Sequence, residues 1–204
     1  MDKLKKIVGL CLVVIIIASC NTKSKSKLEQ PGVVSESMQK ENIQFDKAKI
    51  FQAALDGNIQ VVQDALENGF DPNTVDENTR TALMLAAYNG HTAIVQLLID
   101  READVNFADE IQRTALMYAS SGPFVNTVLA LLHAGAKPNL TEKEQNWTAA
   151  MMAAAEGQLE VLKTLVAFGA DLSLVDVDGE SSLDFADSKG YSDVSEYIKN
   201  QIGR

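Results

Sequence analysis

The sequence contains few of the residues on which enzymatic chemistry most often depends. Its 204 residues include two cysteines, Cys11 and Cys20, and two histidines, His91 and His133. Because both cysteines precede residue 21, the rest of the chain has no thiol for a disulfide, a nucleophile or a zinc site. Neither histidine belongs to a recognisable order of nucleophile, base and orienting group, and the strings G-x-x-x-x-G-K, H-E-x-x-H and G-x-S-x-G are absent. We therefore expect no enzymatic activity, no cofactor and no metal site.

The sequence also lacks an apolar run as long as the roughly 20 residues of an ordinary membrane-spanning helix. The run Ile7–Ile17 is little more than half as long, follows three lysines and ends at Ile17-Ala18-Ser19-Cys20. A basic start, a short apolar segment and small residues before a cysteine resemble the signal peptide of bacterial lipoproteins. The resemblance implies that residues 1–19 are removed and that Cys20 is lipidated at the periplasmic face of a membrane. An uncleaved signal anchor is the alternative.

Residues 20–45 are expected to form a flexible tether behind the lipid. Lys23-Ser24-Lys25-Ser26-Lys27 is polar, and Pro31-Gly32 interrupts regular structure. Asn21 directly after the cysteine resembles the pattern that sends lipoproteins to the outer rather than the inner membrane. The lipid on Cys20 would be the only membrane contact.

Basic residues are scarce in the remainder of the chain. Residues 46–204 contain 11 lysines and arginines against 24 aspartates and glutamates. Such a surface repels a phosphate backbone, so we expect no binding of nucleic acid. It would accelerate encounter with a protein that is basic at its contact surface. Solubility alone explains the acidity equally well, and both readings stay open.

The sequence does contain a repeated phrase. It reads Thr-Ala-Leu-Met-Leu-Ala-Ala from Thr81, Thr-Ala-Leu-Met-Tyr-Ala-Ser from Thr114 and Thr-Ala-Ala-Met-Met-Ala-Ala from Thr148. Weaker copies begin at Ala48 and Ser181, so the phrase recurs at a nearly constant period of about 33 residues. A fixed period of this length indicates a stack of similar supersecondary units.

The rest of each period follows the same order. A glycine such as Gly90 ends the first segment, an apolar stripe at helical spacing follows, and an exit such as Ala-Gly-Ala-Lys-Pro-Asn (134–139) closes the unit. Together these features resemble the ankyrin repeat. The resemblance implies an all-α solenoid over residues 46–204, with about four repeats, a C-terminal cap and short β-hairpin-like fingers. The units would be 48–80, 81–113, 114–147, 148–180 and 181–204.

The repeat positions also predict which side chains are buried. Met84, Met117 and Met151 share one position, which favours a core stripe over a thioether site. Leu98 and Leu165 are expected in the core of the stack. In the last unit Val194, Tyr197, Ile198 and Ile202 should point inward and Ser195 outward. Asp176 and Asp178, on a finger, are expected to be solvated.

The resemblance implies that another protein binds the concave face of the solenoid, which the finger tips and the exposed ends of the first helices form. The finger positions are Glu77, Asn78, Arg80, Glu110, Ile111, Arg113, Glu144, Gln145, Trp147, Asp178 and Glu180, and the helix positions are Tyr88, Asn89, Ser121 and Glu156. Arg80, Tyr88, Arg113 and Trp147 are residue types that dominate interface energetics, and we expect repeat phasing to bring these four anchors onto one continuous face. For Trp147, packing over the neighbouring finger is an equal alternative.

These observations favour a monomeric, lipid-anchored, protein-binding module that acts as a scaffold or accessory factor of the envelope. The alternative is an inhibitor or immunity protein that occludes a toxin or an envelope enzyme. A structural spacer without a saturable partner is the third reading.

Overall fold

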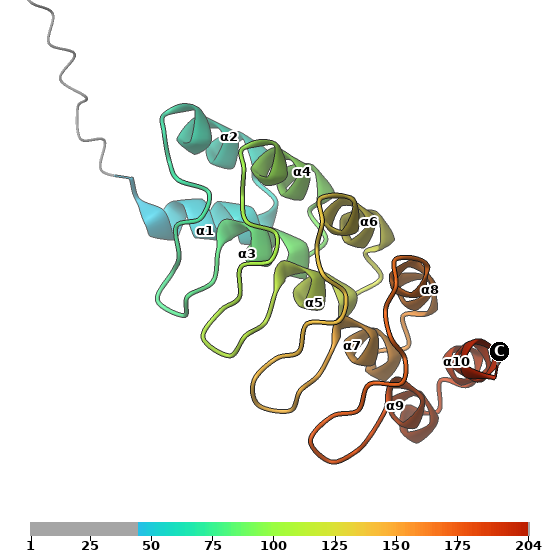
Figure 1. Cartoon of the computed structure of the whole chain (residues 1–204). Helices are drawn as coiled ribbons and strands as arrows, with labels where there is room; N and C mark the ends of the chain where they lie inside the picture. Colours follow the sequence, from blue (N-terminus) through green and yellow to red (C-terminus); the bar gives the residue numbers. More distant parts are fainter. Residues whose placement is uncertain (1–44, 204) are drawn as a thin grey trace, which may run out of the picture. The chain divides into compact units, whose positions relative to one another are not determined.

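The structure, a computed structural model, describes residues 45–203. The predicted signal peptide, Cys20 and nearly all of the tether lie outside the described residues. The described part contains ten α-helices: α1 (Lys47–Asp56), α2 (Ile59–Glu67), α3 (Ala82–Tyr88), α4 (Thr92–Asp100), α5 (Ala115–Ser120), α6 (Val125–His133), α7 (Ala149–Ala155), α8 (Leu159–Ala167), α9 (Ser182–Lys189) and α10 (Ser192–Ile202). Figure 1 shows the odd-numbered helices in one row and the even-numbered helices in a second row.

Four long loops join each even-numbered helix, from α2 to α8, to the next odd-numbered helix. We call them fingers one to four, over residues 71–81, 104–114, 137–148 and 171–181. Isolated antiparallel bridges close three of them, between Val75 and Thr81, Ala108 and Thr114, and Val175 and Ser181. Residues 45–203 contain helices and these bridges but no strand, so the predicted all-α solenoid with hairpin-like fingers is confirmed. No helix within that range is long and apolar enough to cross a membrane.

The threonine of the repeated phrase starts each first helix. Side-chain oxygens of Thr81, Thr114, Thr148 and Ser181 accept a hydrogen bond from the backbone N–H three residues further on, at 3.2–3.4 Å. This N-cap satisfies one of the backbone donors that a helix leaves unpaired at its start. The phrase that revealed the period therefore also fixes where α3, α5, α7 and α9 begin.

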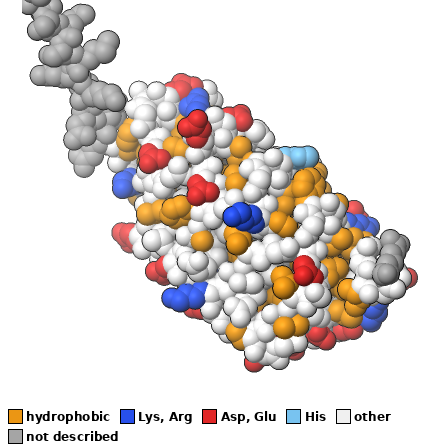
Figure 2. Space-filling view, in the orientation of Figure 1, with side chains coloured by type: hydrophobic (Ala, Val, Ile, Leu, Met, Phe, Trp, Pro, Cys, Tyr) orange, Lys and Arg blue, Asp and Glu red, His pale blue; other side chains and the backbone are white. Residues whose placement is uncertain are grey.

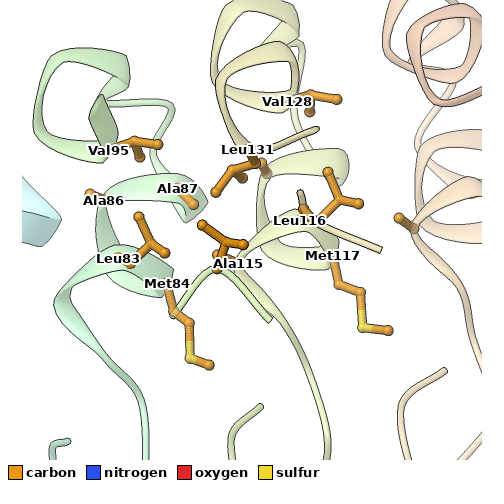
Figure 3. Close-up of a cluster of buried hydrophobic side chains, with 14 of the residues drawn as sticks. Leu83, Met84, Ala86, Ala87, Val95, Ala115, Leu116, Met117, Val128 and Leu131 are labelled. Carbon is orange, nitrogen blue, oxygen red and sulfur yellow. The ribbon is translucent and has the colours of Figure 1, made fainter. Parts of the chain in front are cut away.

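The core lies between successive helix pairs. Leu98, Leu131 and Leu165 occupy one position in α4, α6 and α8 and are completely buried. The expected methionine stripe is also buried, because Met84 and Met117 are 1% exposed and Met151 is inaccessible. Figure 3 shows Met84 and Met117 extending in the same direction from neighbouring helices. Both predictions about the core are confirmed.

Asparagines link each repeat to the next. The side chains of Asn73, Asn106 and Asn139 each accept a hydrogen bond from a backbone N–H of the following repeat, at 2.7–2.9 Å. Each also donates to a backbone carbonyl there, at 3.0–3.4 Å. Because one amide satisfies both a donor and an acceptor, this ladder holds neighbouring exits in register.

The glycine after the first helix has two functions. Gly90 has a φ of 70°, which favours a residue without a side chain. A Cβ at this position would lie 2.1 Å from the ring of Phe124 in the following repeat. Glycine therefore permits both the turn and the close approach of the next unit.

The last unit is a complete helix pair, and two expectations about α10 were wrong. Val194 and Ile198 are buried as predicted, but Ile202 is 54% exposed. Ile202 lies in the final turn of α10, where none of the described residues covers it. Ser195, expected outside, is 4% exposed and is one of the buried residues of α10.

Candidate protein-binding surface

Each finger is held by one carboxylate near its middle. In fingers one, two and four this residue is Asp76, Asp109 and Asp176, which share one position of the repeat. One oxygen of each accepts the backbone N–H groups of the residues two and four further on, at 2.8–3.1 Å. An aspartate that binds its own loop in this way replaces backbone pairing and fixes the turn.

Burial of these carboxylates corrects one prediction. Asp176 was expected to be solvated, yet it is only 7% exposed, and Asp109 is 4% exposed. The N–H groups of the finger surround Asp176 and take the place of water. Asp178, at the tip, is exposed as expected.

Finger three uses a longer side chain for a longer loop. It has one residue more than the others, and Glu142 stands where they have aspartate. Its two oxygens accept the N–H groups of Glu144, Gln145 and Trp147 at 2.8, 2.6 and 3.2 Å. With 2% of its surface exposed, Glu142 is the most buried of the finger carboxylates. The side chain of Glu142 is one methylene longer than that of aspartate, and it holds a finger that is one residue longer than the others.

The second oxygen of the aspartate has a different partner in each finger. In finger one, Asp76 Oδ2 accepts the Nε–H of Arg80 at 2.9 Å and lies 2.8 Å from its terminal nitrogen. In finger two, Asp109 Oδ2 accepts the hydroxyl of Tyr118 at 2.7 Å. In finger four, Asp176 Oδ2 accepts the indole N–H of Trp147 at 3.3 Å. The aspartate at this one repeat position therefore binds a different side chain in each of the three fingers.

These contacts shift the pKa values of Asp76 and Tyr118. Burial alone would raise the pKa of Asp76, but hydrogen bonds from Arg80 and Asn78, together with the charge of Arg80, lower it below its ordinary value. Burial, then the hydrogen bond to Asp109 and its charge, raise the pKa of Tyr118 to about 12. At neutral pH Asp76 is therefore an anion, and Tyr118 is a neutral donor.

Backbone hydrogen bonds join the last three fingers. The N–H of Lys143 donates to the carbonyl of Ile111 at 2.8 Å, and the N–H of Val177 donates to the carbonyl of Gln145 at 3.0 Å. Across residues 45–203, no such bond joins finger one to finger two. Fingers two to four thus form one connected edge.

Most of the predicted contact residues are accessible to a partner. The exposed ones are Glu77, Asn78, Tyr88, Asn89, Glu110, Glu144, Gln145, Glu156, Asp178 and Glu180, and the partly buried ones are Arg80, Ile111, Arg113, Ser121 and Trp147. Figure 2 shows acidic and basic side chains set among apolar ones on the face that it presents.

Part of the predicted set meets in two adjoining hollows between fingers two and three. One, of about 130 Å³, is lined by Arg113, Ser121, Trp147, Met152 and Glu156. The other, of about 120 Å³, has Arg113, Trp147 and Met152 in common with it and adds Glu142, Glu144 and Gln145. We call the two together the Arg113 hollow.

Arg80 lies elsewhere, in a larger hollow of about 680 Å³ beside α1 and finger one. Glu77 and Asn78 line this hollow with it, and so do Phe51 and Leu55 of α1. Arg80 therefore lines a different hollow from Arg113 and Trp147, and Tyr88 lines none of the three.

Two of the predicted contact residues also hold the structure together. The ring of Trp147 packs on Phe185 with centroids 4.5 Å apart, and its N–H reaches Asp176 of finger four. Packing over the neighbouring finger, the alternative raised for this residue, therefore takes place. Asn89 donates its amide to the carbonyl of Leu55, at 2.7 Å, and so fixes the end of α1.

Tyr88 is the anchor with the freest side chain. It is 53% exposed, and its ring meets that of Tyr118 edge to face, with centroids 6.0 Å apart. Its contacts therefore leave half of the side chain available to a partner.

Sequence reasoning missed the finger carboxylates, the asparagine ladder and Tyr118. A signal for the first two was present, because Asp76, Asp109 and Asp176 recur at one repeat position, as do Asn73, Asn106 and Asn139. Tyr118 was hidden, since the other two strong copies of the repeated phrase have the apolar residues Leu85 and Met152 at its position.

A family model described as ankyrin repeats (3 copies) matches residues 50–142 and again residues 124–203. One relative is glycerophosphocholine phosphodiesterase gde1 of Schizosaccharomyces pombe (strain 972 / ATCC 24843), which is 33% identical over 75 residues. Those residues are 37% of this chain but 7% of that enzyme, so the chain spans a small fraction of its length. Ankyrin repeats form a non-catalytic fold that generally serves as a protein-interaction module. With its stacked helix pairs and fingers, the chain belongs to the ankyrin repeat family.

Proposed function

We propose that this chain is a lipid-anchored protein-binding module of the bacterial envelope, acting as a scaffold or accessory factor. Its partner would bind the face formed by the fingers and the neighbouring ends of the odd-numbered helices. The observation that carries the proposal is the construction of the fingers. Buried carboxylates fix the backbones of fingers two to four, while the tips with Glu110, Glu144 and Asp178 remain exposed. A rigid loop with accessible side chains loses little conformational freedom on binding.

The charge of the finger tips supports a partner that is basic at its contact surface. Glu77, Glu110, Glu144, Asp178 and Glu180 are all exposed. Exposed charges of one sign accelerate encounter more than they hold a complex together. The acidic tips would therefore act mainly on the association rate, and their effect would weaken as salt is added.

The membrane part of the proposal rests on Ile17-Ala18-Ser19-Cys20 in the sequence. Acyl chains on Cys20 would hold the protein at the periplasmic face, with the outer membrane as the expected location. Metabolic labelling with a radioactive fatty acid tests this, because the wild type should be labelled and Cys20→Ala should not. Equal labelling of the two, or no label in either, would contradict the anchor.

The binding part is tested by capture from an envelope extract with the full chain as bait. A double variant, Tyr88→Ala with Glu110→Lys, changes the proposed face. Gln96→Ala is the matched control, because Gln96 is exposed on α4 in the other row of helices. One specific protein should be retained by the wild type and by Gln96→Ala and should be lost from the double variant. Loss from Gln96→Ala alone would place the partner on the even-numbered helices and reject the proposed face.

A further inference from the structure

Arg80 and Arg113 stand at the same repeat position, one period apart, but their side chains have different surroundings. The guanidinium of Arg80 is paired with Asp76, at 2.9 Å from Nε and 2.8 Å from a terminal nitrogen. Arg113 makes no ion pair with any carboxylate in residues 45–203. Its Nε is buried and has no hydrogen-bond partner in that part of the chain.

One substitution between the repeats accounts for the difference. Leu85 in α3 corresponds to Tyr118 in α5, again one period further along the chain. The hydroxyl of Tyr118 donates to Asp109 Oδ2 at 2.7 Å, and Asp109 Oδ1 already accepts two backbone N–H groups. Both oxygens of the aspartate next to Arg113 are therefore engaged. The tyrosine takes the contact that the arginine makes in finger one.

The guanidinium of Arg113 remains a strong donor without an acceptor of matching charge. A buried N–H that loses water and gains no partner is unfavourable, and the cost is larger for charged groups. Other nearby carboxylates do not relieve it. Glu142 is bound by three backbone N–H groups of its own finger, and among the described residues neither Glu144 nor Glu156 forms an ion pair with Arg113.

The Arg113 hollow has room for the end of a side chain. Its two parts measure about 130 and 120 Å³, below the range of about 300–1,000 Å³ usual for small-molecule sites. Met152 and the indole of Trp147 form apolar walls beside the guanidinium. Such walls exclude water and strengthen a charge-assisted hydrogen bond.

We propose that Arg113 binds a carboxylate on an aspartate or glutamate side chain of the partner protein, and that Tyr118 keeps Arg113 available by occupying Asp109. Because Nε is buried, the two terminal nitrogens of the planar guanidinium are the groups that can donate two parallel hydrogen bonds to one carboxylate. The inference rests on the proposed protein-binding function and adds a requirement to it. Acidic finger tips attract basic segments in general, whereas the Arg113 hollow selects those that also carry an acidic residue.

The probe is a library of displayed random peptides, selected on the immobilised full chain. Peptides enriched by the wild type should share an aspartate or glutamate with basic residues around it. A synthetic copy of one such peptide then serves in a double-mutant cycle. Arg113→Gln in the protein, or replacement of the acid by its amide in the peptide, should each weaken binding at least about tenfold. The two changes together should cost no more than either alone.

Three further variants separate this role from a general loss of structure. Arg101→Gln removes a guanidinium at the end of α4, outside the proposed face, and is the matched control that should change affinity less than about threefold. Tyr118→Leu recreates the arrangement of finger one and should weaken binding as Arg113 turns to Asp109. Tyr118→Phe keeps the ring, removes only the hydroxyl and should act in the same direction. Circular dichroism verifies that each variant is folded.

The outcomes also distinguish this inference from the proposed function. If selected peptides lack a shared acid, or bind Arg113→Gln as well as the wild type, yet lose affinity with Tyr88→Ala, the carboxylate site is rejected and the binding face stands. If their affinity depends on Gln96 and not on Tyr88, both the carboxylate site and the proposed face are rejected.

Discussion

The even-numbered helices and the fingers repeat in different ways. In the helices, α4, α6 and α8 supply the same leucine at the same depth, as Leu98, Leu131 and Leu165 show. In the fingers, the anchoring carboxylate is kept, but in fingers one, two and four its second oxygen binds Arg80, Tyr118 or Trp147. The stack requires uniformity because each repeat must fit the next, whereas a finger needs only a carboxylate that holds its backbone. Variation in the side chain that binds this carboxylate changes which groups the surface presents.

The first prediction concerns the uniform part and has the largest expected effect. Leu98→Ala should lower the free energy of unfolding by about 2–5 kcal/mol, because it removes buried apolar contacts and leaves a cavity. Gln96→Ala, on the exposed face of the same helix, should change it by less than about 0.5 kcal/mol. Urea denaturation followed by circular dichroism measures both. Equal midpoints for Leu98→Ala and the wild type would show that α4 does not pack as described.

The second prediction concerns the carboxylate that holds each finger, tested at Asp109 of finger two. Asp109→Ala leaves the N–H groups of Ile111 and Arg113 without their acceptor and should cost about 1–3 kcal/mol. Glu110→Ala, at the exposed neighbour, serves as control and should be nearly neutral. Hydrogen exchange should show faster exchange of the Arg113 amide in Asp109→Ala only. Unchanged exchange would mean that another group holds finger two.

The third prediction concerns the pH dependence of the stability that Asp76 gives to finger one. Because the folded pKa of Asp76 is lowered, its ionised form stabilises the folded state above the unfolded pKa of about 3.9. That contribution is lost as the pH falls through the folded value. The stability difference between the wild type and Asp76→Asn should therefore be constant near neutral pH and shrink below about pH 4. Urea midpoints measured from pH 6 to pH 2 test this, and a difference independent of pH would contradict the pairing with Arg80.

The fourth prediction concerns the ionisation of Tyr118, which does not change the stability of the protein at neutral pH. The folded pKa of Tyr118 is raised to about 12, so its contribution to stability is complete below the unfolded value of about 10 and is lost as the pH rises towards 12. Tyrosinate absorbance, taken as the difference between the wild type and Tyr118→Leu, should show one ionisation near pH 12. An ionisation near pH 10 would show that the hydroxyl does not donate to Asp109.

The comparison also explains how far the sequence could predict the molecule. The stack was predictable because Thr81, Thr114 and Thr148 repeat a local rule, an N-cap followed by apolar residues, that does not depend on distant contacts. The role of the finger carboxylates could not be predicted, since the burial of Asp176 depends on how a loop folds around its carboxylate. Tyr118 shows the same limit, because its importance arises only from the position of Asp109 nine residues earlier. A periodic pattern thus reveals what repeats share but not how one repeat differs from its neighbours.

The most direct test of the central claim is the binding kinetics of the captured partner with two exposed-site variants of the full chain. Tyr88→Ala lies on the proposed face and avoids Trp147, whose packing on Phe185 would mix stability with binding. It should leave the association rate nearly unchanged and raise the dissociation rate, at a cost of about 2 kcal/mol if Tyr88 is a hot spot. Gln96→Ala, on the even-numbered row, should change neither rate. A faster dissociation for Gln96→Ala with none for Tyr88→Ala would contradict recognition by the fingers.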